Sequence, residues 1–185
     1  MRTFGWSREL SSKKQLEKKF PDIDPRFLFV NTGFNFRPTE IQGSFGIHQI
    51  DKLEKLVRIR IKNANYWTQR LSIFSDYLIL PNENKQRKSY LLYPITVKKN
   101  KFFTKNDLVN ELERNGISTR PLMTGNILNQ PVSKYMKFRK SGRLKNANYI
   151  QKNAFLLGNH HEILDEQKKF IADVISNYII SKTSS

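Results

Sequence analysis

The chain has 185 residues, 38% of them hydrophobic and 12% aromatic, which is enough to bury a core and excludes a wholly disordered protein. A formal net charge of +17 favours anionic partners: nucleic acid, an anionic membrane surface or a phosphorylated small molecule. The absence of cysteine excludes disulfides, thiolate nucleophiles and zinc–cysteine sites. No apolar run approaches the roughly 20 residues that span a bilayer, and no signal peptide is recognisable, so we expect a cytoplasmic protein without a membrane partner.

The first predicted element of note is a long helix over residues 39–71. It follows a charged, irregular start, in which residues 11–20 can form one short helix and residues 24–30 are apolar and extended. Thr39 and Gln42 have the spacing of a capping box. Apolar residues then recur mostly three, four or seven apart, as on one face of an amphipathic helix: Ile41, Phe45, Ile50, Leu53, Val57, Ala64, Trp67 and Leu71.

Short strands and helices follow. YLIL (77–80) and SYLLYPITVK (89–98) are rich in aromatic and branched residues and are predicted to be strands. Thr104 is expected to cap a helix over residues 105–115, and Gly116 to close it in a left-handed conformation.

The C-terminal third is predicted to contain two further strands, ISTR (117–120) and AFLLG (154–158). Between them, residues 121–143 have no period and two prolines, and we expect a long loop of the kind that often carries function. A last helix is expected behind Asp165 as its cap. The pattern predicts an α+β fold, with helices on one face of a small, mainly antiparallel sheet.

The three histidines do not suggest a metal site. His160 and His161 are adjacent, and neighbouring side chains on a strand point to opposite faces. No carboxylate or third histidine stands at a spacing typical of zinc sites. His48 falls within the long predicted helix, where a surface or packing role is expected. We therefore assign no metal, and the chain has neither a GxGxxG nor a Walker motif.

Nucleic acid is a competing partner. Residues 85–103 and 134–149 interleave aromatic side chains with lysine and arginine, which could combine phosphate contacts with base stacking. No known RNA-binding signature accompanies this composition. A basic, non-catalytic module that binds RNA or another polyanion is therefore the less favoured alternative, and nucleic acid the less favoured partner.

The turn NTGFNFRPTE (31–40) precedes the long helix and has two interpretations. Gly33 can adopt a positive φ, while Asn35 and Arg37 supply an amide and a guanidinium beside a helix start, a combination suited to a phosphate. It can equally be an ordinary loop in which the asparagine caps its own backbone. Spacing alone favours the ordinary loop.

A family resemblance adds to these patterns. GFNFRPTEIQGSFGIHQIDKL (33–53) resembles the turn and long helix of the DegT-type (DegT/DnrJ/StrS) nucleotide-sugar aminotransferases, which use pyridoxal phosphate. RTFGWSREL, DPRFLFVNTGFNF, LLYPITV, GISTRPLMTGN and AFLLGNHHEILDEQ resemble successive blocks of that family in the same order. RPLMTGNILNQP is more similar to the 3-dehydrase-like branch, which acts on 4-keto-6-deoxy hexoses. The residues that carry this second likeness are Arg120, Gly125, Asn126, Gln130 and Pro131.

The resemblance implies the C-terminal half of such an enzyme. Residues 1–38 would be the end of the large domain and a connecting segment, and residues 39–185 the small C-terminal domain of a fold-type-I aminotransferase, with 39–71 as an interdomain helix. The Schiff-base lysine of the family, or the histidine that replaces it in dehydrases, would precede residue 1. The chain alone would then be inactive, and would need the N-terminal large domain and a second subunit of a homodimer.

The resemblance also assigns roles to single residues. Asn35 would bind the cofactor phosphate of the neighbouring subunit, with Arg37 assisting, and Arg120 and Asn126 would border the nucleotide-sugar substrate. No catalytic residue is assigned to the chain itself. The implied activity is a sugar aminotransferase or 3-dehydrase that makes a deoxy or amino sugar for surface polysaccharide.

Overall fold

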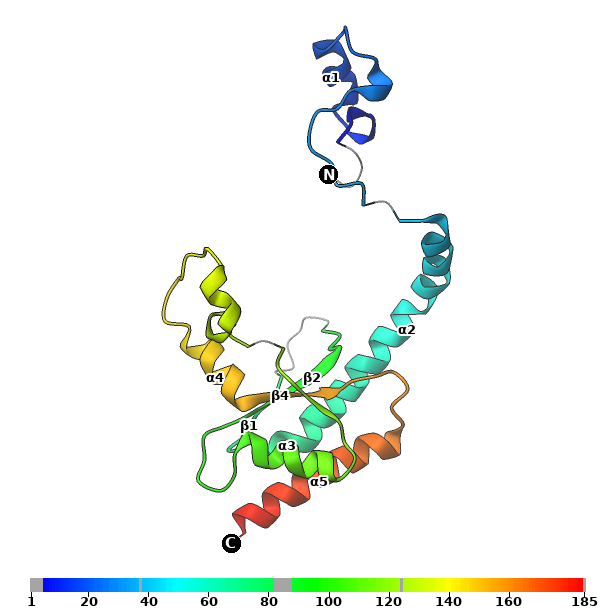
Figure 1. The fold of residues 1–185 in the computed structure, drawn as a ribbon. Coiled ribbons are helices and arrows are strands. Elements are labelled where there is room, and N and C mark those ends of the chain that lie inside the picture. Colours follow the sequence, from blue (N-terminus) through cyan, green and yellow to red (C-terminus); the bar gives the residue numbers. More distant parts are fainter. Residues whose placement is uncertain (1–4, 37, 82–87, 124, 185) are drawn as a thin grey trace. The chain divides into compact units, whose positions relative to one another are not determined.

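The computed structural model describes residues 5–36, 38–81, 88–123 and 125–184. These form two compact units, Met1–Lys52 and Leu53–Ser185. The long helix α2 (Glu40–Leu71) contributes residues to both (Figure 1). The predicted domain boundary between residues 38 and 39 falls at the start of α2, whereas the compact units divide within this helix.

The N-terminal unit is built from short turns. It contains η1 (Ser7–Glu9), α1 (Lys13–Lys19) and η2 (Pro25–Phe27). Trp6 and Phe29 form an isolated antiparallel bridge, and their rings stack with centroids 5.9 Å apart. The predicted short helix over residues 11–20 is confirmed as α1, which buries none of its side chains.

Helix α2 begins and ends where the sequence predicts. The Thr39 backbone N–H donates to Gln42 Oε1 at 2.9 Å, and the Gln42 backbone N–H donates to Thr39 Oγ1 at 3.4 Å. Its apolar stripe has two different environments. Near the C-terminal end Ala64, Trp67 and Leu71 are buried, whereas near the start the side chains remain open: Ile41 81% exposed, Phe45 71%, Ile50 63% and Leu53 51%.

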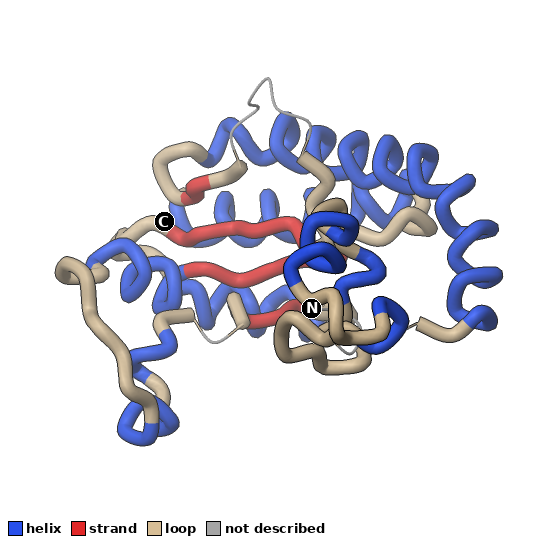
Figure 2. The backbone as a smooth tube through the Cα atoms, turned by 90° about the horizontal axis from the view of Figure 1, so that it is seen from above, coloured by secondary structure: helices blue, strands red, loops and turns tan. Residues whose placement is uncertain are grey.

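The second unit contains a four-stranded antiparallel sheet in the order β1-β2-β4-β3 (Figure 2). The strands are β1 (Leu78–Ile79), β2 (Leu92–Val97), β3 (Thr119–Pro121) and β4 (Ala154–Gly158). In the central pair, Tyr93 lies opposite Leu157 and Ile95 opposite Phe155. All four of these side chains are buried and face the same side, because alternate residues of a strand share a face.

Three helices cover this apolar face (Figure 1). The C-terminal part of α2, α3 (Lys105–Arg114) and α5 (Asp165–Thr183) contribute Trp67, Leu108, Leu112 and Ile175 to the same core. The expected α+β arrangement is thereby confirmed.

The predicted caps of α3 are also confirmed. Thr104 Oγ1 accepts a hydrogen bond from the Asp107 backbone N–H, and Asp107 Oδ2 accepts one from the Thr104 backbone N–H at 2.8 Å. Gly116 has a φ of +74°. The predicted cap of α5 is wrong by one residue, since Leu164 is the N-cap and donates its backbone N–H to Gln167 Oε1. Asp165 instead begins the helix and forms an ion pair with Lys168.

Helix α4 (Lys145–Asn153) was not predicted, nor were the turns η4 (Ile127–Asn129) and η5 (Pro131–Tyr135) within the expected long loop. Helix α4 buries none of its side chains and starts after Leu144 without a side-chain cap. It therefore lacks the capping residue from which the start of a helix is recognised in a sequence.

No helix of the described chain combines the length and the apolar character needed to cross a membrane. This agrees with the lack of long apolar runs in the sequence.

An ion-pair link between α2 and α5 predicts a pH dependence of stability. Asp173 accepts hydrogen bonds from Lys169 Nζ at 3.0 Å and from Arg70 Nη2 at 3.1 Å, and these lower the pKa of its carboxyl. Because folding lowers this pKa, the stabilisation is present above the unfolded pKa of about 3.9 and is lost as the pH falls through the folded pKa. For such a surface pair we expect about 1 kcal/mol or less.

Urea unfolding of wild type and Asp173→Asn from pH 7 to pH 2.5 measures this contribution. The difference in free energy of unfolding between wild type and Asp173→Asn should be constant above pH 5 and should shrink below about pH 4. Asp76→Asn is the control, because within the described chain this exposed carboxylate makes no ion pair. A difference that grew on acidification would contradict the assignment.

Candidate functional site

The turn before α2 presents Asn35 in an unusual conformation. Its φ is +55°, in the left-handed region that asparagine tolerates better than most residues. The side chains of Phe34, Asn35 and Phe36 are exposed, and the two phenylalanine rings stack with centroids 5.9 Å apart. Among the described residues none makes a hydrogen bond to the Asn35 side chain. The turn therefore displays an amide that no described residue engages.

An uncommitted amide is chemically suited to a phosphate. Its nitrogen offers two donors, and phosphate oxygens are acceptors. The donor chemistry at Asn35 thus fits the phosphate of pyridoxal phosphate. Arg37, the second predicted cofactor residue, lies outside the described residues, and its role stays a prediction.

The other two predicted site residues lie in the second unit, at either end of the segment from β3 to η4. Arg120 is the central residue of β3, opposite Leu156 of β4, and its side chain is exposed. Asn126 caps η4 and is only 7% exposed. Between them Gly125 has a φ of +62°, and a Cβ added there would lie 2.4 Å from Gln151 Cγ. Glycine is therefore required where this segment passes α4.

A cluster of four amide side chains ties this segment to α4. We call Asn126, Asn129, Asn148 and Gln151 the amide cluster. Asn148 Oδ1 accepts from Asn126 Nδ2 at 2.8 Å and from Asn129 Nδ2 at 3.0 Å. Gln151 Oε1 accepts from Asn129 Nδ2 at 2.7 Å and from the Asn126 backbone N–H at 3.2 Å. Asn126 thus fixes the loop that contains it to α4.

Sequence reasoning missed the other members of the amide cluster. Asn148 and Gln151 are three apart, so they share a face once residues 145–153 are recognised as a helix. A pocket of about 910 Å³ opens beside them, and its lining includes Asn129, Asn148, Gln151 and the lysines Lys98, Lys99, Lys105 and Lys152. Its polar, cationic lining suits an anionic ligand.

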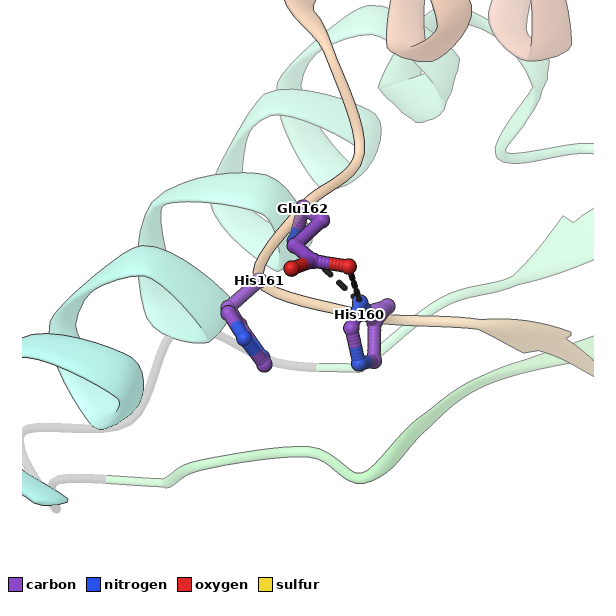
Figure 3. Close-up of side chains that lie close together, drawn as sticks. All are labelled: His160, His161 and Glu162. Carbon is purple, nitrogen blue, oxygen red and sulfur yellow. Dashed lines mark hydrogen bonds and ion pairs between the residues drawn. The ribbon is translucent and has the colours of Figure 1, made fainter. Parts of the chain in front are cut away.

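The two adjacent histidines lie closer together than predicted. Strand β4 ends at Gly158, so His160 and His161 lie in the turn that follows it and not on a strand. Their ring centroids are 4.1 Å apart, and Glu162 joins them (Figure 3). The expectation that the two side chains point to opposite faces is wrong, because strand alternation does not apply in a turn.

Comparison with known proteins agrees with the predicted family. The profile of the DegT/DnrJ/EryC1/StrS aminotransferase family matches residues 1–176. The GDP-4-keto-6-deoxy-D-mannose 3-dehydratase of Escherichia coli O55:H7 is 33% identical over 180 residues, which are 95% of this chain and 45% of that protein.

Solved structures give the same result. The E. coli GDP-4-keto-6-deoxy-D-mannose-3-dehydratase with bound hydrated pyridoxal phosphate matches with a TM-score of 0.78 and 32% identity, covering 94% of this chain and 45% of that one. A variant of the GDP-4-keto-6-deoxymannose-3-dehydratase with bound GDP-perosamine matches with a TM-score of 0.76, at the same identity and coverage. This chain thus spans somewhat less than half the length of these relatives. With a family profile that covers nearly all of its residues, the chain belongs to the DegT/DnrJ/EryC1/StrS aminotransferase family.

Proposed function

We propose that this chain forms the C-terminal portion of a pyridoxal-phosphate-dependent enzyme that acts on a nucleotide-linked 4-keto-6-deoxy hexose. Removal of the 3-hydroxyl group is favoured over amino transfer. The observation that carries this proposal is the 33% identity to a 3-dehydratase over 95% of the chain. When bound, pyridoxal phosphate would supply the electron sink for this chemistry.

The complete site would need a second segment. The relatives extend beyond the part that this chain matches. We assign the residues that hold the cofactor ring to a segment equivalent to the part of the relatives that this chain does not match. The proposed assembly is a homodimer in which this chain contributes Asn35 to the phosphate of its neighbour's cofactor, with Arg37 beside it. The exposed amide in a left-handed turn, which no described residue engages, supports this role for Asn35.

We assign substrate contacts to the segment between β3 and η4. The exposed guanidinium of Arg120 suits the phosphates of a nucleotide sugar, because arginine binds phosphate through two parallel hydrogen bonds. Asn126 would border the sugar while the amide cluster holds its loop. No proton-transfer residue is assigned to this chain, so its proposed contribution is to bind and orient.

Reconstitution tests this proposal. The chain would be co-expressed with the part of the E. coli relative that it does not match, and the complex would be purified in the presence of pyridoxal phosphate. We expect an absorbance band at the edge of the visible range that shifts when GDP-4-keto-6-deoxymannose is added. A folded complex without the band, together with tight and salt-sensitive RNA binding, would instead favour the basic module.

Asn35→Ala in the reconstituted enzyme tests the cofactor role. Loss of one hydrogen bond to a charged phosphate should cost about 1.5–3 kcal/mol of binding, or roughly 10- to 100-fold in the dissociation constant of pyridoxal phosphate. Fluorescence titration of the apoenzyme measures it, and urea unfolding of the apoenzyme measures stability in parallel.

Asn31→Ala is the matched control for this variant. Asn31 is the other asparagine of the N-terminal unit, and its Oδ1 accepts from the Thr32 backbone N–H. This variant should keep cofactor affinity. The assigned role of Asn35 would be overturned if Asn35→Ala lost stability and cofactor affinity to the same extent, or lost neither.

A further inference from the structure

The turn between β4 and α5 brings three metal-ligating side chains together. We call His160, His161 and Glu162 the HHE turn. One ligand atom from each lies within 4.8 Å of the other two. His160 Nδ1 is 3.7 Å from Glu162 Oε2, and Figure 3 shows the two imidazoles side by side with the carboxylate directed towards His160. Three residues in succession thus present two nitrogens and a carboxylate at one place.

Buried amides fix the backbone beneath this turn. Asn63 of α2 donates from Nδ2 to the His160 carbonyl at 3.0 Å. Asn159 donates from Nδ2 to the Tyr90 carbonyl at 2.8 Å and to the Arg60 carbonyl of α2 at 3.1 Å. Both asparagines are 1% exposed. The start of the turn is therefore held against α2.

The Nδ1 atoms of the two imidazoles have different surroundings. His160 Nδ1 accepts a hydrogen bond from the Glu162 backbone N–H at 3.2 Å, so this nitrogen is not protonated, and a cation bound to it would replace that hydrogen bond. His161 Nδ1 is shielded from solvent and has no hydrogen-bond partner within the described chain. A shielded polar atom without a partner raises the free energy of the fold, and such atoms are uncommon. A bound cation would give His161 Nδ1 the interaction partner that it lacks within the described chain.

We propose that the HHE turn binds a zinc ion through His160, His161 and Glu162. Imidazole nitrogen with carboxylate oxygen is a zinc donor set, whereas calcium and magnesium prefer oxygen alone. Three protein ligands leave the fourth tetrahedral position for water. With zinc–nitrogen distances of about 2.0–2.1 Å, two ligands of one ion lie ~3.4 Å apart. His160 and Glu162 have side chains that are 54% and 79% exposed, so they are free to close this gap.

Zinc binding to the untagged chain tests the proposal by isothermal titration calorimetry, with polyhistidine tags removed. We expect one zinc per chain, a melting temperature that rises with zinc, and no equivalent binding of magnesium. Glu162→Gln and His161→Gln should each weaken zinc binding at least tenfold. His48→Gln is the matched control, because it removes the third histidine of the chain from outside the HHE turn and should bind zinc as the wild type does.

Folding is checked by far-UV circular dichroism for every variant. Glu162→Gln exchanges an exposed side chain for one of the same shape and should keep the fold, so it remains informative even where His161→Gln does not fold. The proposal is overturned if the wild type shows no saturable zinc binding, or if Glu162→Gln binds zinc as tightly as His48→Gln does.

Discussion

Trp67→Ala is expected to lower the free energy of unfolding of residues 53–185 by about 3–5 kcal/mol. The indole is fully buried, and its ring centroid lies 5.3 Å from that of Tyr93 on the central strand β2. Its Nε1 donates a 3.2 Å hydrogen bond to the Lys168 carbonyl in the first turn of α5. The substitution therefore opens a cavity between α2 and the sheet and removes a link to a second helix.

Urea unfolding followed by far-UV circular dichroism measures this loss. Ile41→Ala is the control on the same helix, because that side chain is largely exposed and its removal should change the free energy by no more than about 0.5 kcal/mol. A loss below 1 kcal/mol in Trp67→Ala would show that α2 is not part of the core that stabilises this unit.

Gly5→Ala is expected to destabilise the N-terminal unit by about 2–5 kcal/mol, the sum of the costs of a left-handed conformation and of overpacking. Gly5 has a φ of +89°, and an added Cβ would lie 1.8 Å from the Asn31 carbonyl oxygen. The backbone cannot retreat without loss of other bonds, because the Gly5 carbonyl accepts from the Val30 and Asn31 backbone N–H groups at 2.9 and 3.2 Å.

Amide hydrogen exchange at Ser7 and Val30 reports on this turn, since each donates a backbone hydrogen bond across it. Exchange at both should accelerate at least tenfold in Gly5→Ala. Gly43→Ala is the matched control: nothing lies within 4 Å of its added Cβ, and alanine in a helix interior should stabilise by about 0.5–1 kcal/mol. Unchanged protection of Val30 in Gly5→Ala would contradict the described turn.

Many of the helix ends and strands could be predicted from local signals. The capping residues Thr39 and Thr104 and the left-handed Gly116 each act within a few residues of themselves, so the sequence reveals them directly. The alternation of buried residues along β2 likewise depends on period alone. These signals were sufficient for the α+β class, since each strand and helix buries one face against the same core.

The remainder depends on contacts that sequence spacing does not reveal. Helix α4 buries none of its side chains and is tied to its neighbouring loop through the amide cluster, whose partners lie 19 to 25 residues apart in the sequence. The two histidines of the HHE turn lie side by side because β4 ends at Gly158, before the histidines, so the alternation of side chains along a strand does not apply to them. Asn35 was identified by family resemblance, whereas its exposed side chain and positive φ came only from the structure.

The amide cluster has a consequence for how the loop behind β3 responds to its surroundings. Asn126, Asn129, Asn148 and Gln151 carry no charge, so acid, base and salt leave their hydrogen bonds intact. If ion pairs held this loop, an anionic ligand would compete for their cationic side chains, and the net charge of +17 attracts such ligands. The neutral amide cluster has no charged partner to lose, so the loop can bind a charged ligand while its own attachment stays unchanged.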